Sequence, residues 1–136
     1  MLALYQSDRD HDHLFEDFHP EQNSHQEYTE RIRGRDGICL VAELDGEVIA
    51  CLTGLILVAP EERPAKRTRL EKLFVKEEFR GKGIGAALIE AFVKWSRDKG
   101  VERVFVRTYA TNESAIHLYE RFGFRPYVLS LVLPIE

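Results

Sequence analysis

The sequence predicts an α/β (α+β) fold: a mixed β-sheet with helices on both faces, formed by one domain that covers residues 1–136. Hydrophobic runs of strand length alternate with segments whose apolar residues recur every three or four positions, which is the pattern of strands and amphipathic helices. Turn residues separate most of these segments. The length suits one hydrophobic core, and the composition of 44% hydrophobic and 31% charged residues is that of a globular chain.

The first elements are a short strand and a helical region. Leu2–Gln6 has the length and composition of a strand. Residues 8–33 are expected to form one or two helices, broken near Pro20 because proline cannot occupy a helix interior.

A β-hairpin follows. The apolar segments Ile38–Leu44 and Glu47–Val58 flank Asp45-Gly46, a pair that suits a two-residue turn with positive φ. Residues 60–65 contain two prolines and are expected to form a loop, after which Thr68–Val75 is the next strand.

The clearest helix begins at Ile84. Its apolar residues fall on one continuous stripe, and Gly100 is placed to end it: Ile84, Ala87, Leu88, Ala91, Phe92 and Trp95. A strand at Arg103–Tyr109, a second helix at Asn112–Phe122 and a last strand at Tyr127–Leu133 complete the expected order.

Composition excludes several classes of function. The net charge is −4, with nine acidic and four basic residues in positions 1–37 and a near balance afterwards. A nucleic-acid partner is therefore not expected, because a phosphate backbone needs a basic face. No apolar run reaches the roughly 20 residues that span a bilayer. Neither a membrane nor a signal peptide is indicated, so we expect a cytoplasmic protein whose Cys39 and Cys51 are buried thiols.

The segment Arg80-Gly81-Lys82-Gly83-Ile84-Gly85 lies between a strand and a helix. Glycines allow the backbone to approach a ligand, and the following helix offers unpaired N–H groups and the positive end of its dipole. With the two basic side chains, these features are typical of a pyrophosphate site. A P-loop is excluded because no Gly-Lys-Ser/Thr is present. A dinucleotide site and a plain turn at the start of a helix remain alternatives.

Two motifs together resemble the GNAT acetyltransferase superfamily. The first joins Leu70–Val75, a five-residue spacer and the Arg80–Gly85 turn, and the second is Asn112–Phe124, with its Gly-Phe exit. The resemblance implies a splayed sheet with a β-bulge in the strand before the turn. It also implies that acetyl-CoA is the cosubstrate, without a metal, and that a primary amine of a small molecule or peptide accepts the acetyl group.

The resemblance further implies which residues bind acetyl-CoA. Backbone groups of the strand before the turn would form hydrogen bonds with the pantetheine arm, and the turn would hold the pyrophosphate. Asn112 would bond the same arm where the two splayed strands separate. The full set is Leu73, Phe74, Val75, Arg80, Gly81, Lys82, Gly83, Ile84, Gly85, Ala86, Asn112 and Ala115.

Two residues are candidates for catalysis. Tyr119 matches the family tyrosine beside the coenzyme sulfur, where it would donate a proton to the leaving thiolate; packing on the core face is the alternative. Glu71 is the candidate general base, acting through water. An ion pair of Glu71 with Arg69 or Arg107 is the alternative to that role.

Other readings concern the two ends of the chain and rival functions. The alternation of acids and histidines at positions 8–13 suggests a metal site, but alternate residues of a helix would not converge, so no metal is expected. The last residues of the chain offer one strand where the family usually has two, so we expect a homodimer pairing near Tyr127–Leu133.

The rival functions are a catalytically silent acyl-CoA-binding module and a nucleotide-binding oxidoreductase.

Overall fold

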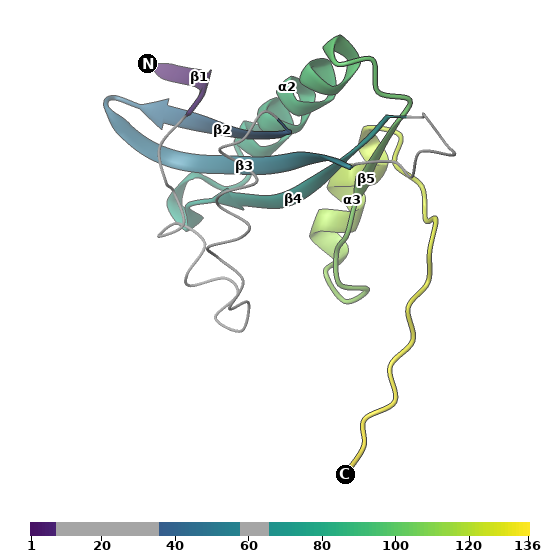
Figure 1. Ribbon diagram of the computed structural model, residues 1–136. Helices are drawn as coiled ribbons and strands as arrows, with labels where there is room; N and C mark the ends of the chain where they lie inside the picture. The colour runs from purple at the N-terminus through teal and green to yellow at the C-terminus, as the bar shows by residue number, and fades with distance from the viewer. Residues whose placement is uncertain (8–35, 58–65) are drawn as a thin grey trace.

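The computed structural model describes residues 1–7, 36–57 and 66–136. They form one mixed sheet in the order β1-β2-β3-β4-β5, in which the first four strands are antiparallel and β4 and β5 are parallel (Figure 1). The elements are β1 (Leu2–Gln6), β2 (Gly37–Leu44), β3 (Glu47–Leu57), β4 (Arg67–Val75), the 3₁₀ turn η2 (Glu77–Phe79), α2 (Ile84–Asp98), β5 (Arg103–Val106) and α3 (Glu113–Arg121). The expected mixed α/β fold is confirmed.

The hairpin of β2 and β3 forms where the sequence predicts it. Asp45 and Gly46 have φ values of 49° and 88°, so both central residues of the turn are in the left-handed region that a type I′ turn requires. The pairing continues from Leu44 opposite Glu47 to Gly37 opposite Leu55.

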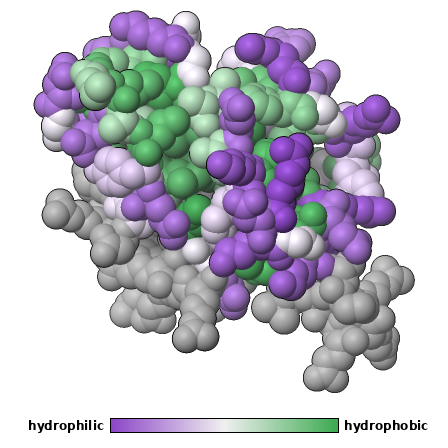
Figure 2. Space-filling model, turned by 90° about the horizontal axis from the view of Figure 1, so that it is seen from above, coloured by the Kyte–Doolittle hydropathy of each residue, from purple (hydrophilic) through white to green (hydrophobic). Residues whose placement is uncertain are grey.

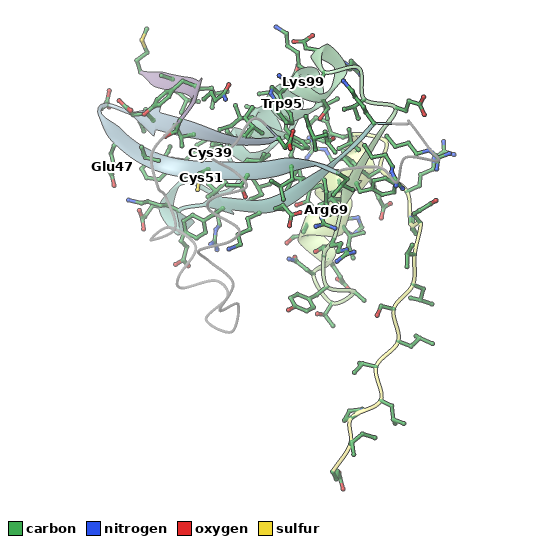
Figure 3. The ribbon with its side chains drawn as sticks, viewed as in Figure 1. Cys39, Glu47, Cys51, Arg69, Trp95 and Lys99 are labelled. Carbon is green, nitrogen blue, oxygen red and sulfur yellow. The ribbon has the colours of Figure 1, made fainter. Side chains whose placement is uncertain are left out.

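The two faces of the sheet carry separate hydrophobic clusters, because successive side chains of a strand point to opposite faces. On β2, Ile38 and Leu40 belong to the larger cluster, whereas Cys39 and Val41 belong to the smaller one with Cys51 (Figure 3). Both cysteines are buried thiols, as expected.

Both described helices pack on the face of the larger cluster. The fully buried apolar side chains of α2 are Leu88, Ile89 and Phe92, and Tyr119 of α3 joins the same cluster. The helices expected between residues 8 and 33 lie outside the described residues, so the expectation of helices on both faces stays a prediction. No helix in the described ranges is long and apolar enough to cross a membrane.

A buried polar contact joins α2 to β4. The side-chain oxygens of Thr68 and Ser96 lie 2.8 Å apart, and both residues are almost completely shielded from solvent. Close packing joins α2 to β3 as well, since a Cβ added at Gly54 would lie 2.2 Å from the ring of Phe92.

The strand β4 changes partner along its length. The register with β3 shifts between Thr53 and Gly54, whose partners are Lys72 and Leu70, so Glu71 is the extra residue of a β-bulge. On the other side, β4 pairs with β5 only from Arg67 to Leu70. The bulge and the splayed sheet implied by the resemblance are therefore present.

Two expectations about the second half of the chain are wrong. The strand β5 ends at Val106 instead of Tyr109, because its ladder with β4 stops there. Residues 127–133 do not form a strand, since they pair with no strand among the described residues, and their large apolar side chains are 69–89% exposed.

Candidate active site

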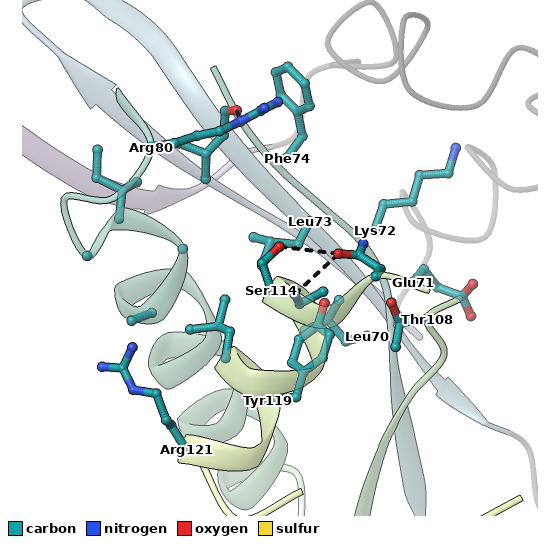
Figure 4. Close-up of a pocket in the computed structure, with 18 of the residues that line it drawn as sticks. Leu70, Glu71, Lys72, Leu73, Phe74, Arg80, Thr108, Ser114, Tyr119 and Arg121 are labelled. Carbon is teal, nitrogen blue, oxygen red and sulfur yellow. Dashed lines mark hydrogen bonds between the residues drawn. The ribbon is translucent and has the colours of Figure 1, made fainter. Parts of the chain in front are cut away.

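One cleft of about 1190 Å³ opens where the β4–β5 ladder stops. Its walls are β4, the turn before α2, the segment after β5 and α3 (Figure 4). All residues that the sequence predicts for the site line this cleft except Lys82. The splay of the sheet thus brings together two motifs that are far apart in the sequence.

The turn at one end of the cleft is built for close approach of a ligand. Gly81 and Gly83 have φ values of 77° and 83°, a region that side chains other than glycine rarely adopt. A Cβ added at either position would meet no atom within 4 Å, so the space beside the backbone is open.

The helix α2 begins at this turn without a side-chain cap. Gly83 is its N-cap, no side chain bonds to the first amides, and no acidic residue lies in the first turn. The first N–H groups of a helix have no partner within the helix and carry the positive end of its dipole. The residues present therefore fit a bound anion such as a pyrophosphate.

The two basic residues of the turn lie differently. The Nε of Arg80 donates a hydrogen bond to the carbonyl oxygen of Val75 at 2.9 Å, which fixes this side chain at the wall of the cleft. The Nζ of Lys82 lies instead 5.6 Å from the ring centroid of Phe79, and Lys82 does not line the cleft.

The three strand residues predicted to bind the pantetheine arm form the wall after the bulge. Leu73, Phe74 and Val75 pair with β3 on one side, and the cleft lies beyond the end of the ladder on the other. The helix α2 approaches this wall closely: a Cβ at Gly85 would lie 3.8 Å from side-chain atoms of Leu73 and Val75.

Asn112 serves first as the N-cap of α3. Its Oδ1 accepts hydrogen bonds from the backbone N–H of Ala115 and the hydroxyl of Ser114, both at 3.3 Å (Figure 4). Capping directs this side chain to the cleft while its amide nitrogen carries two further N–H donors.

Tyr119 is buried at 8% exposure, although its ring lines the cleft. In Figure 4 its hydroxyl points toward the end of α3 at which Ser114 lies. The ring packs edge-on against Phe124, with 5.7 Å between centroids, and the hydroxyl makes no hydrogen bond within the described part of the chain. Desolvation by burial raises the pKa of the Tyr119 hydroxyl above its usual value, so the group is protonated at neutral pH.

Glu71 lies at the bulge and lines the cleft, but it also forms an ion pair. The Nε of Arg69 donates to its Oε1 at 2.5 Å, and the two side chains are 23% and 17% exposed. Of the two partners considered from the sequence, Arg69 is the one observed.

Several lining residues were not predicted from the sequence: Arg107, Thr108, Tyr109, Ser114, Leu118 and Arg121. The first three fall in the segment expected to continue β5, so no sequence signal separated them from the strand. The described ranges hold no group of three or more His, Cys, Asp or Glu side chains placed for a metal ion, and positions 8–13 lie outside them.

Comparison with known proteins gives consistent matches. The profile of the acetyltransferase (GNAT) family matches residues 5–124. An N-alpha-acetyltransferase of Sulfurisphaera tokodaii is 28% identical over 112 residues, which are 78% of this chain and 67% of that protein. Several other curated relatives are longer, and the chain spans less than half of their length.

Solved structures match along the whole chain. An aminoglycoside acetyltransferase from an uncultured soil metagenomic sample is 25% identical with a TM-score of 0.77, covering 100% of this chain and 99% of that one. An aminoglycoside N-acetyltransferase solved in complex with CoA is 20% identical with a TM-score of 0.78, covering 99% and 95%.

Proposed function

The chain belongs to the acetyltransferase (GNAT) family, and we propose that it transfers an acetyl group from acetyl-CoA to a primary amine of a small molecule or peptide. The observation that carries this proposal is the cleft at the split between β4 and β5. It joins an anion-binding turn, the β4 wall and a buried, protonated tyrosine.

The two ends of the cleft carry groups that suit the two ends of the acetyl-CoA molecule. The uncapped start of α2 would bind the pyrophosphate through its amide groups, helped by Arg80. The backbone of Leu73–Val75 and the amide of Asn112 would bond the peptide-like pantetheine arm. The thioester would then lie toward Tyr119.

The reaction needs little further machinery. A neutral amine attacks the thioester carbonyl carbon, a C–N bond forms, and the C–S bond breaks. Tyr119 then donates its phenolic proton to the departing sulfur. Because burial raises the pKa of Tyr119, the phenol still carries this proton at neutral pH. The attacking nitrogen loses a proton at the other side of the thioester.

Glu71 is the proposed acceptor of that proton, through water. It lies in the wall of the cleft, and the bulge projects it from the regular register of β4. Its ion pair with Arg69 holds the carboxylate at the wall of the cleft.

The acceptor is proposed to be cationic. Residues 1–37 carry a net charge of −5, and an excess of negative charge attracts positively charged amines. The structural match at 25% identity is an aminoglycoside acetyltransferase, a further support for an amine with several positive charges. A polyamine or a lysine-like compound also fits.

Calorimetry with acetyl-CoA and a thiol-release assay over a panel of amines test the proposal. We expect acetyl-CoA to bind, NADH not to bind, and at least one cationic amine to release thiol. Binding without release for any amine would favour the silent acyl-CoA-binding module, and no affinity for any acyl-CoA would refute the site itself.

A matched pair of variants locates the binding site. Gly83→Asp places a carboxylate at the start of α2, where it would bond the amides and repel a pyrophosphate, so acetyl-CoA affinity should fall at least about tenfold. Gly100→Asp is the control, since its φ of 75° and open surroundings impose the same backbone strain beyond the other end of α2. Equal affinities of the two variants would contradict the placement.

A further inference from the structure

The charged side chains that line the cleft are divided between its two sides. In the part of the chain that the structure describes, they are Arg69, Glu71, Lys72, Arg80, Arg107 and Arg121, and only Glu71 among them is acidic. In Figure 4, Arg80 and Arg121 lie toward α2, whereas Glu71 and Lys72 lie across the cleft on β4. The phosphates of acetyl-CoA, which are proposed to bind at the start of α2, would therefore lie on the side of Arg80 and Arg121.

The charges on the other side of the cleft have no counterpart in the donor. Arg69, Lys72 and Arg107 face a single carboxylate there, so among the described residues this side carries an excess of positive charge. The pantetheine arm and the thioester are uncharged, so this part of acetyl-CoA does not balance the excess. A negative group on the acceptor would balance it.

Arg107 is the basic residue best placed to bind such a group. Glu71 pairs with Arg69 and not with Arg107. Arg107 forms no hydrogen bond or ion pair with the described residues, and its side chain is exposed while it lines the cleft. A guanidinium carries five N–H donors in a planar fork, which matches the two oxygens of a carboxylate.

The fold places Arg107 close to the proposed base. The ladder of β4 and β5 ends at the pair of Leu70 and Val106. Glu71 and Arg107 are the next residues of the two chains, and neighbouring strands lie about 4.8 Å apart, so the two residues leave the ladder side by side. Figure 4 shows Thr108, the residue after Arg107, next to Glu71. A group bound by Arg107 would therefore lie near the amine that Glu71 deprotonates.

We propose that the acceptor carries a carboxylate in addition to its amine and that Arg107 binds this carboxylate. The inference rests on the proposed transfer to an amine, and it selects lysine-like compounds, whose net charge is still positive, over polyamines. A carboxylate suits this site better than a phosphate, because the neighbouring Glu71 carboxylate repels a doubly charged group more strongly.

The basic side chains also penalise acceptors that have no carboxylate. A polyamine would bring only positive charge toward Arg69, Lys72 and Arg107, and like charges repel. A carboxylate on the acceptor replaces part of this repulsion with attraction. The specificity would therefore come from both effects, one favouring the right acceptor and one disfavouring the wrong one.

Acceptors that differ in the carboxylate test the proposal. L-lysine is compared with lysinamide, in which a neutral amide replaces the carboxylate, and with cadaverine, which lacks the group. Calorimetry measures the binding of each to the protein saturated with CoA, and thiol release from acetyl-CoA gives the KM of each. We expect L-lysine to bind at least about tenfold more tightly than the other two and to have the lowest KM.

Variants of Arg107 locate the carboxylate site. Arg107→Gln should weaken the binding of L-lysine at least about tenfold, and leave the affinities for cadaverine and acetyl-CoA unchanged. Arg107→Lys should restore part of the preference, because it keeps the charge without the planar fork. The control is Arg97→Gln, which removes a charge from an exposed position of α2 outside the cleft lining. Figure 2 views the molecule from the side of α2, where hydrophilic side chains are prominent. The control should keep the full preference for L-lysine.

The binding measurement separates this proposal from the proposed function, because it does not require turnover. Equal affinities for the three acceptors, no binding of L-lysine, or equal weakening of L-lysine and cadaverine by Arg107→Gln would each overturn the carboxylate site. A preference for L-lysine that depends on Arg107 would support the site even without thiol release, and that absence of release would refute only the acetyl transfer.

Discussion

Replacing Tyr119 with phenylalanine removes one hydroxyl from the cleft and leaves the ring in place. A general acid contributes about 10²–10⁴ in rate, so the turnover number should fall at least about 100-fold, which corresponds to about 2.7 kcal/mol of transition-state stabilisation. Affinity for acetyl-CoA should change little, because the contacts proposed for its pyrophosphate and pantetheine come from the α2 turn, β4 and Asn112, which line the cleft apart from Tyr119.

The same substitution should cost little stability. The hydroxyl forms no hydrogen bond with the described residues, so Tyr119→Phe breaks none, and the free energy of unfolding should change by about 1 kcal/mol or less. Burial raises the pKa of Tyr119, so the folded state disfavours the phenolate. The stability linked to this group is fully present below the unfolded pKa of about 10 and is lost as pH rises through the folded pKa. Tyr119→Phe should therefore unfold less readily than the parent chain at alkaline pH.

Single-turnover kinetics separate the two explanations of this tyrosine. The assay follows thiol release with saturating acetyl-CoA and amine, so that chemistry is observed before product release. Tyr5→Phe is the control, because Tyr5 bonds to Glu43 on an exposed surface of β1 away from the cleft. If Tyr119→Phe turned over as fast as Tyr5→Phe in the chemical step, Tyr119 would be a packing residue and the acid role would be refuted.

Two other substitutions test the site and the framework behind it. Glu71→Gln should lower turnover by about 10²-fold or more and remove the acidic limb of the pH–rate profile. Glu113→Gln, on the exposed start of α3 and outside the cleft lining, is the control. If Glu71→Gln retained the acidic limb that the control shows, Glu71 would be excluded as the base. Thr68→Val should lower the free energy of unfolding by about 1–3 kcal/mol in urea, because the buried Ser96 hydroxyl would lose its partner. Adding Ser96→Ala should recover part of this loss, and strictly additive effects would show that the contact contributes nothing.

Sequence patterns predicted the elements whose signals are local. The hairpin turn at Asp45-Gly46 and the start of α2 at Ile84 lie where the sequence places them, because positive φ and an apolar stripe are read from neighbouring residues. The start of α3 was also close: the helix begins at Glu113 with Asn112 as its cap. Most of the proposed donor site follows from these elements.

Features that depend on a distant partner were not predicted from pattern alone. The strand β5 ends at Val106 because its ladder with β4 ends there. The sequence from Arg107 to Tyr109 still looks like a strand, so it does not predict this end. Family resemblance implied a bulge in the strand before the turn but not its position, which the structure places at Glu71, since alternation along the strand does not reveal an extra residue. Lys82 was assigned to the site because of its charge, but its ammonium group lies over the ring of Phe79 and does not line the cleft. Residues 127–133 have the composition of a strand, but they pair with no strand among the described residues.

The lining of the cleft has a consequence for how this protein can diverge. Among the residues that the structure describes, all those that line the cleft fall between Arg69 and Arg121, so the proposed donor half of the site lies in one stretch of sequence. The proposed acetyl-CoA site can therefore be transferred to another protein as one segment, while positions before it change. New acceptor preferences should then arise by changes upstream of β4 or at Arg107, and laboratory libraries aimed at a different amine can leave the rest of this segment untouched.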